Sequence, residues 1–203
     1  MDDQDDSTRG LKVLVTGGAR SGKSAWAELQ LADFAAVTYI ATSQNRADDP
    51  EWQQRVRIHQ QRRPSHWQTI ETIELVDVLL AADDAPILID CMSVWLTRVL
   101  DEVGAWPGEP GWQQRLNERK QPLFAALQRS RRAAILVTNE VGLGVVPATP
   151  AGRLFRDELG RLNAELAQLV DQVWLSVSGI TRRWDGPAER LDWTCRGECR
   201  WAR

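Results

Sequence analysis

The sequence predicts one α/β domain, built on a mostly parallel β-sheet with helices on both faces. Three observations support this prediction. Several short runs are apolar along their whole length, as in LKVLVT at residues 11–16, which is typical of strands buried on both faces. Amphipathic segments with helical spacing separate these runs, as expected for parallel strands joined by crossover helices. The first run leads into the glycine-rich turn GGARSGKS, residues 17–24, which a helical segment follows.

The first half of the chain shows this alternation in order. After the strand at 11–16, helical spacing over 24–34 predicts a helix, and VTYIAT at 37–42 predicts a second strand. A helix is expected over 49–63, because this segment starts with Asp-Pro and is rich in helix formers. WQTIET at 67–72 is predicted to be a short strand.

The second half continues the same pattern. Helices are expected at residues 74–82, 91–103, 112–131 (with Pro122 as a start or a kink) and 151–171. Strands are expected at 85–90, at 133–138 and, as the last strand of the chain, at 172–178. The segments at 105–111 and 139–150 are rich in Gly and Pro and are predicted to be loops.

Composition and the chain ends narrow the class of protein. The 203 residues suffice for one domain, expected at 11–180, between an acidic and disordered leader at 1–10 and a tail at 181–203. Cys195 and Cys199 in the tail lack the partner ligands of a metal site and are predicted to be inert. The net charge of -3 argues against nucleic-acid binding and against a DNA-dependent ATPase. No apolar run could span a membrane and the leader is unlike a signal peptide, so a cytoplasmic protein is expected.

The glycine-rich turn matches the P-loop pattern GxxxxGK[ST] and lies between a strand and a helix. Gly17 and Gly22 let the backbone turn tightly and bring its N–H groups to phosphate oxygens, and the following helix directs its positive end at the same anion. Lys23 supplies a charge for the β- and γ-phosphates, and Ser24 can hold Mg²⁺. The pattern predicts nucleoside triphosphate binding but leaves the base open, because a guanine-reading NKxD motif is absent. The whole cradle comprises Gly17, Gly18, Ala19, Arg20, Ser21, Gly22, Lys23 and Ser24.

Two acidic residues follow buried strands, at the edge of a parallel sheet where ligands bind. Asp90 ends the strand ILID and is the expected partner of Ser24 in holding Mg²⁺. Its alternative role is to cap the helix that follows. Glu140 follows the strand at 133–138 and could orient a nucleophile, bind substrate or cap a turn.

The segment RVRIHQQRRPSHW, residues 55–67, gathers positive charge around one of the two histidines. On a helix, Arg62 and Arg63 share the face of His59, and like charges at that spacing repel unless an anion lies among them. The pKa of the imidazole should be lowered in this setting, which leaves a neutral ring able to attack phosphorus. These residues alone leave His59 as either a nucleophile at an α-phosphate or a surface histidine, while His66 is expected to be structural.

Four motifs in fixed order give the chain a specific resemblance: VLVTGGARSGKS, YIATSQ, IHQQRRPSHW and VTNEVGLGVVP. Over residues 11–180 it resembles the bifunctional adenosylcobinamide kinase / adenosylcobinamide-phosphate guanylyltransferases of cobalamin biosynthesis. The family pattern RHxxxRPxxW is the most diagnostic part, although Ile58 stands here where the family often has a basic residue. The leader and the tail are additions to the family pattern.

The resemblance implies a RecA-like P-loop NTPase fold, a homotrimer and two reactions. The enzyme would phosphorylate the corrinoid adenosylcobinamide with ATP or GTP, and would then transfer GMP from GTP to that phosphate through a guanylylated histidine. By position this histidine is His59, and Lys23 would be the second catalytic residue. The implied nucleotide contacts are the cradle Gly17 to Ser24, then Ala41, Thr42, Ser43, Gln60, Gln61, Arg62, Arg63, Glu71 and Asp90.

Two simpler functions stay open at this point. A P-loop small-molecule kinase without nucleotidyl transfer would need only the cradle and Asp90, and His59 would be dispensable. A regulatory nucleotide-binding module would bind without turnover, but it would leave the cluster of arginines around His59 unexplained.

Overall fold

The computed structural model describes residues 10–43 and 63–185. The predicted leader, nearly all of the helix predicted at 49–63, and the end of the predicted tail with Cys195 and Cys199 lie outside these residues.

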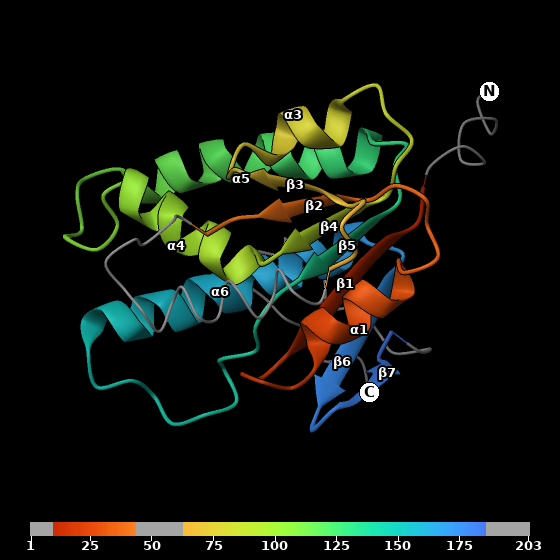
Figure 1. Ribbon diagram of the computed structural model, residues 1–203. Coiled ribbons are helices and arrows are strands. Elements are labelled where there is room, and N and C mark those ends of the chain that lie inside the picture. The colour runs from red at the N-terminus through yellow and green to blue at the C-terminus, as the bar shows by residue number, and fades with distance from the viewer. Residues whose placement is uncertain (1–9, 44–62, 186–203) are drawn as a thin grey trace, which may run out of the picture.

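The described residues form a seven-stranded sheet with the order β3-β2-β4-β5-β1-β6-β7 (Figure 1). Every pairing is parallel except that of β7 with β6, so the predicted mostly parallel sheet is confirmed. Strand β5 lies between β1, which leads into the P-loop, and β4, which ends in Asp90. The strands are β1 Lys12–Gly17, β2 Thr38–Ala41, β3 Gln68–Glu71, β4 Ile87–Asp90, β5 Ala134–Val137, β6 Gln172–Val177 and β7 Ile180–Arg183.

Helices cover both faces of this sheet, as predicted. Alternate residues of a strand point to opposite faces, so Leu14 packs in the layer of α3, α4, α5 and α6, whereas Val15 packs in the layer of α1. The described helices are α1 Lys23–Gln30, α3 Leu75–Leu80, α4 Met92–Glu102, α5 Trp112–Arg129 and α6 Pro150–Leu169. None of them is both long and apolar enough to cross a lipid bilayer.

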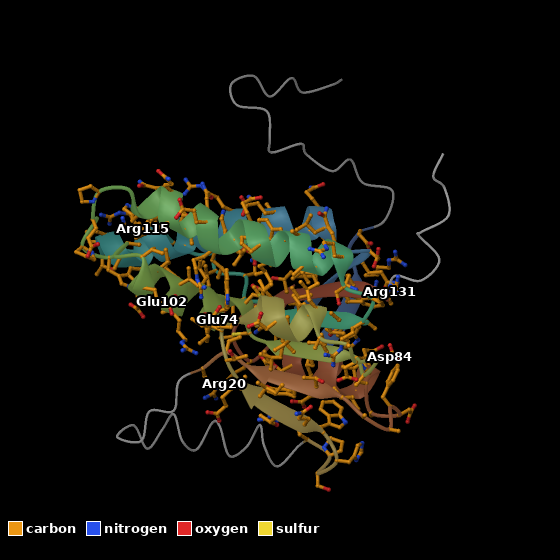
Figure 2. All side chains as sticks on the ribbon, turned by 90° about the horizontal axis from the view of Figure 1, so that it is seen from above. Arg20, Glu74, Asp84, Glu102, Arg115 and Arg131 are labelled. Carbon is orange, nitrogen blue, oxygen red and sulfur yellow. The ribbon has the colours of Figure 1, made fainter. Side chains whose placement is uncertain are left out.

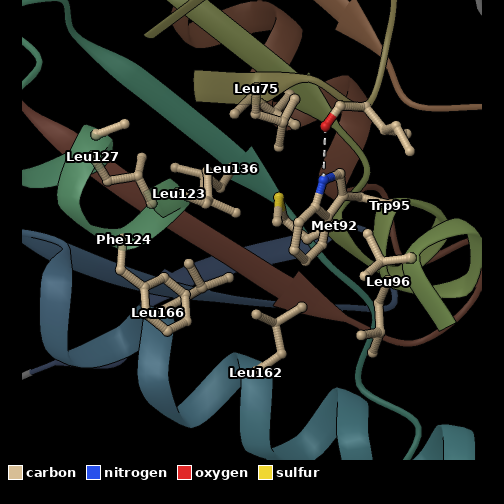
Figure 3. Packing of buried hydrophobic residues seen from close by; sticks show 14 of the residues in the cluster. Leu75, Met92, Trp95, Leu96, Leu123, Phe124, Leu127, Leu136, Leu162 and Leu166 are labelled. Atoms are coloured by element: carbon tan, nitrogen blue, oxygen red, sulfur yellow. Dashed lines mark hydrogen bonds between the residues drawn. The ribbon is translucent and has the colours of Figure 1, made fainter. Parts of the chain in front are cut away.

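The larger hydrophobic layer is built around Trp95 of α4, which is 2% exposed (Figure 3). Its indole lies among apolar side chains from α5, α6 and the sheet, and Nε1 donates to the carbonyl of Ile73 at 3.0 Å. A buried indole N–H needs such a partner, and this bond ties α4 to the segment that leads into α3.

The expectation that residues 172–178 form the last strand is wrong. Ser178 and Gly179 have φ angles of 52° and 81°, which form a tight two-residue hairpin turn, and β7 then pairs with β6. Residues 181–183 of the predicted tail therefore belong to the sheet. ITRR has no apolar run because β7 is an edge strand with most of its side chains exposed. Pro122 lies inside α5 and does not start a helix.

Candidate active site

The P-loop joins β1 to α1 at the carboxyl edge of the sheet (Figure 1). Gly17 has no room for a side chain, because a Cβ there would lie 2.2 Å from the carbonyl oxygen of Ser176. Gly22 has a φ of 96°, a left-handed conformation that glycine adopts without strain, and no described side chain caps α1 at this position. The first N–H groups of α1 are therefore available to an anion, as the sequence predicted.

Lys23 is 8% exposed and folds back over its own loop, where Nζ donates to the carbonyl of Gly18 at 3.0 Å. Burial lowers the pKa of the ammonium group, against the opposing influence of Cys91 and of the Asp90 carboxylate nearby. The structure thus brings the Lys23 ammonium close to Asp90, the carboxylate expected to hold Mg²⁺ together with Ser24.

Strand register places three predicted nucleotide contacts in one row. Ala41 pairs with Glu71 on one side and with Asp90 on the other, and Asp90 pairs with Val137. Ligands of such sheets bind outside this edge, so these residues lie where the sequence analysis expected chemistry.

Thr42 follows β2 and is fully buried, with its polar groups bound to protein. Its hydroxyl accepts from the amide of Cys91 at 3.0 Å and donates to the Cys91 carbonyl at 2.8 Å. Its carbonyl accepts from Arg98 at 3.1 Å. Thr42 thus ties β2 to β4.

Asp90 does not cap α4, because the cap position is Cys91 and carries no side-chain cap bond. Instead, Oδ2 of Asp90 accepts from the hydroxyl of Tyr39 at 3.1 Å. Burial, together with the Asp90 charge, raises the pKa of Tyr39 well above its usual value, so the phenol stays a hydrogen-bond donor at neutral pH.

The donor set at this edge fits Mg²⁺. The Ser24 hydroxyl and the Asp90 carboxylate are oxygen ligands, which this hard cation prefers. The described residues include no group of three or more His, Cys, Asp and Glu side chains that could hold a metal by themselves. Mg²⁺ would therefore be held jointly by these two residues, water and the phosphates of a nucleotide.

Only one residue of the predicted histidine-arginine nucleotide site, Arg63, is described; His59, Gln60, Gln61 and Arg62 lie outside the described residues. The guanidinium carbon of Arg63 lies 3.7 Å from the centroid of the Tyr39 ring, and Nη1 donates to Thr69 at 3.1 Å. His66 is exposed, with Nε2 3.3 Å from the carbonyl oxygen of Phe34, which agrees with a structural role.

Other polar groups near the P-loop complete the site. Oε1 of Glu140 accepts from the amide of Gly142 at 3.2 Å, which is the turn-capping role among those considered for it. The Glu140 amide donates to the Gly17 carbonyl at 3.0 Å and so ties the β5–α6 loop to the P-loop. The buried hydroxyls of Thr16 and Ser21 have no hydrogen-bond partner among the described residues.

Tyr39 is the site residue that the sequence analysis missed. It lies within VTYIAT, residues 37–42, which predicted a strand and gave no sign of a role in the site. The one signal in the sequence is the tyrosine itself, because a buried phenol needs a polar partner. The sequence does not show which strands are neighbours, so it could not name Asp90 as that partner.

Sequence comparisons agree with this geometry. A family model described as "Cobinamide kinase / cobinamide phosphate guanyltransferase" matches residues 13–183. The chain belongs to this family. The resemblance expected from the four motifs is therefore confirmed, and with it the class of enzyme.

Curated relatives match over nearly their whole length. "Bifunctional adenosylcobalamin biosynthesis protein CobU" of Escherichia coli (strain K12) is 43% identical over 178 residues, covering 84% of this chain and 97% of the relative. The protein of the same name from Salmonella typhimurium is 44% identical, with the same coverage. "Bifunctional adenosylcobalamin biosynthesis protein CobP" of Pseudomonas aeruginosa is 38% identical over 174 residues, covering 84% and 95%.

Proposed function

We propose that this protein phosphorylates adenosylcobinamide and then guanylylates the product. The observation that supports this most is the convergence at one sheet edge of the P-loop, Asp90 and the row Glu71–Ala41, in a chain of the cobinamide kinase / guanyltransferase family.

In the kinase step, the hydroxyl oxygen of the aminopropanol arm attacks the γ-phosphorus of ATP or GTP. A new O–P bond forms, the bond to the β–γ bridging oxygen breaks, and the hydroxyl proton is released. The Lys23 ammonium and the uncapped N–H groups of α1 stabilise the charge that develops on the phosphate oxygens. Bound Mg²⁺ would neutralise further charge on the β- and γ-phosphates, held by Ser24 and Asp90.

In the transferase step, the neutral imidazole of His59 attacks the α-phosphorus of GTP and pyrophosphate leaves. A phosphate oxygen of adenosylcobinamide phosphate then attacks the same phosphorus. The P–N bond to His59 breaks, the imidazole is released, and adenosyl-GDP-cobinamide forms. Gln60, Gln61, Arg62 and Arg63 are the residues that we expect to hold the guanine nucleotide during this exchange. We further propose that the enzyme is a cytoplasmic homotrimer.

The test of the covalent step uses GTP labelled at the α-phosphate, with Mg²⁺ and without acceptor. Denatured wild-type protein should retain label that is acid-labile and alkali-stable, as a P–N bond requires, and His59→Ala should retain none. His66→Ala is the matched control, because it removes the other histidine and should label like wild type.

If wild type retains no label while the γ-phosphate is still turned over, the nucleotidyl-histidine is refuted and a plain kinase remains. Label that persists in His59→Ala and disappears in His66→Ala would instead show that His66 is the nucleophile and that its assignment to His59 is wrong. Size measurement of the purified protein in solution tests the trimer separately.

A further inference from the structure

Tyr39 contacts both Asp90 and Arg63, which have different roles in the proposed reactions. Its hydroxyl donates to Oδ2 of Asp90 at 3.1 Å, and its ring lies 3.7 Å from the guanidinium carbon of Arg63. Asp90 belongs to the metal and P-loop side of the site, whereas Arg63 belongs to the segment that carries the expected nucleophile. Tyr39 is the single tyrosine of the chain and is 3% exposed.

Strand register explains why one side chain can reach both residues. Tyr39 pairs with Leu88 on β4 and with Thr69 on β3, so Asp90 lies two residues beyond its partner on one side. Residues two apart on a strand point to the same face, which places the Asp90 carboxylate ahead of the Tyr39 ring. On the other side, Arg63 donates to Thr69 and so spans the pair that Tyr39 forms with β3.

The surroundings of Tyr39 hold this arrangement still. The ring packs in the hydrophobic layer that also contains Val15, Leu88 and Trp67. A buried phenol bonded to a carboxylate has few alternative positions, and the Asp90 oxygen that accepts this bond is fixed with it. The stacked guanidinium of Arg63 is likewise held in one plane, because an arginine over an aromatic face gains a cation–π attraction.

We propose that Tyr39 is a positioning residue that couples the metal-binding carboxylate to the arginine segment, and this inference rests on the function proposed above. Its hydroxyl orients Asp90 toward Mg²⁺ on the bound nucleotide. Its ring orients Arg63 toward the phosphates of the nucleotide that is to be transferred. One residue thereby keeps the two phosphate-handling groups in register for both reactions.

The hydroxyl is tested by Tyr39→Phe, which keeps the ring and removes one oxygen. Binding of a non-hydrolysable GTP analogue is measured calorimetrically, once with Mg²⁺ and once with EDTA. The affinity in EDTA should match wild type, and the gain on adding Mg²⁺ should be about tenfold to a hundredfold smaller, as expected for one hydrogen bond to a charged group. An unchanged Mg²⁺-dependent gain would overturn the role of the hydroxyl.

The ring is tested by comparing Tyr39→Leu with Tyr39→Phe in the rate of forming protein-bound GMP. The leucine variant should be slower by about threefold to tenfold, because Arg63 loses its stacking surface. Equal rates in the two variants would overturn the coupling.

One further variant and the wild-type control separate this inference from other failures. Thr69→Val tests the anchoring of Arg63 on an exposed edge strand if Tyr39→Leu does not fold, and it should also slow the formation of protein-bound GMP. A rate equal to wild type would count against the positioning of Arg63. If wild type forms no bound GMP, the proposed transferase fails, while the calorimetric comparison still decides the role of the Tyr39 hydroxyl.

Discussion

Buried cations occur at both edges of the sheet, and the two edges use them in opposite ways. At the amino edge, Lys12 is fully buried and its Nζ donates to three main-chain carbonyls, those of Gly10, Ser130 and Arg132. At the carboxyl edge, Lys23 is nearly as buried, but it begins α1 and its Nζ donates to the single carbonyl of Gly18, and the buried hydroxyls of Thr16 and Ser21 have no partner among the described residues. Lys12 thus stabilises the fold by bonding main-chain carbonyls, whereas Lys23 belongs to a site that can bind a ligand.

Arg132 strengthens the contrast at the amino edge. It is 4% exposed, and its guanidinium bonds to β2, to α3 and to the loop between α3 and β4. Its acceptors are the carbonyls of Ala85 and Val78, the Thr38 hydroxyl and the Asp83 carboxylate. Its guanidinium is already engaged by four protein acceptors, although a hollow lined by residues 79–84 and 129–132 lies beside it.

The two edges are far apart, so each can be altered without the other. Figure 2 shows Arg20 of the P-loop left of centre, and Asp84 and Arg131 at the right-hand side of the molecule. The difference teaches that burial of a charge does not identify a site. A binding site is indicated when the polar groups around a buried charge still lack protein hydrogen-bond partners.

The largest expected effect is on turnover, from Lys23→Ala. Removing the ammonium deletes a donor aimed at the developing phosphate charge, so kcat for both reactions should fall by about 10²-fold or more. The free energy of unfolding should change by less than about 1 kcal/mol, because the lysine bonds a loop carbonyl and not the core. Steady-state kinetics and urea unfolding measure the two quantities, and a fall in kcat below tenfold would contradict the assignment.

The mirror-image prediction concerns Lys12→Met at the amino edge. Three carbonyls lose their donor, two of them in buried hydrogen bonds, so the free energy of unfolding should fall by about 3 kcal/mol or more. Nucleotide affinity of the folded protein should equal that of wild type. Arg131→Met is the matched control, because Arg131 is exposed at the same edge and its loss should leave stability nearly unchanged. A change in nucleotide affinity with intact stability would remove the distinction between the edges.

The carboxyl edge could be predicted largely from the sequence, and the physical reason is local. The P-loop needs only one strand, one turn and one helix, all contained in residues 11–34. The meeting of Glu71, Ala41 and Asp90 follows from the rule that parallel strands expose their carboxyl ends on one side. The bond between Tyr39 and Asp90 could not be predicted, because it depends on which strands are neighbours, and β2 and β4 are separated in the chain by β3 and α3.

The burial of charged residues at the amino edge could not be predicted from the sequence, for the same reason. Lys12 opens a strand and Arg132 ends a loop, and nothing local distinguishes them from solvated surface residues. Their burial arises only when the loops that precede β1 and β5 pack against each other. Strand β7 was missed because an edge strand exposes its side chains and carries no apolar run.

A smaller effect on the free energy of unfolding is expected at the N-terminus of α6, which a side chain caps. Thr149 caps α6 by accepting from the amide of Gly152 at 3.1 Å, whereas α1 has no side-chain cap and is left open to phosphate. Thr149→Ala should lower the free energy of unfolding by about 1 kcal/mol and leave nucleotide affinity unchanged. Thr149→Ser keeps the hydroxyl and should lose far less. Equal losses in the two variants would show that the cap is not what stabilises this helix start.

The smallest expected effect tests an ion pair that is exposed to water. Glu74 and Arg119 form two hydrogen bonds, at 2.8 and 3.2 Å, but Glu74 is 57% exposed, so solvent screening limits the pair to less than about 1 kcal/mol. The hydrogen bonds from Arg119 lower the pKa of Glu74. A lowered carboxyl pKa contributes stability that is fully present above the unfolded pKa of about 4.3 and is lost as pH falls through the folded value.

Glu74→Gln should therefore be slightly less stable than wild type at pH 7, and the two should converge as pH falls below about 4. Urea unfolding of both proteins over this range measures the difference, with Glu118→Gln as the matched exposed control. A difference that stayed constant with pH would show that Glu74 acts through packing and not through its charge. A loss of several kcal/mol would place this exposed pair among the closed, structural contacts of the amino edge, and the contrast between the two edges would no longer hold.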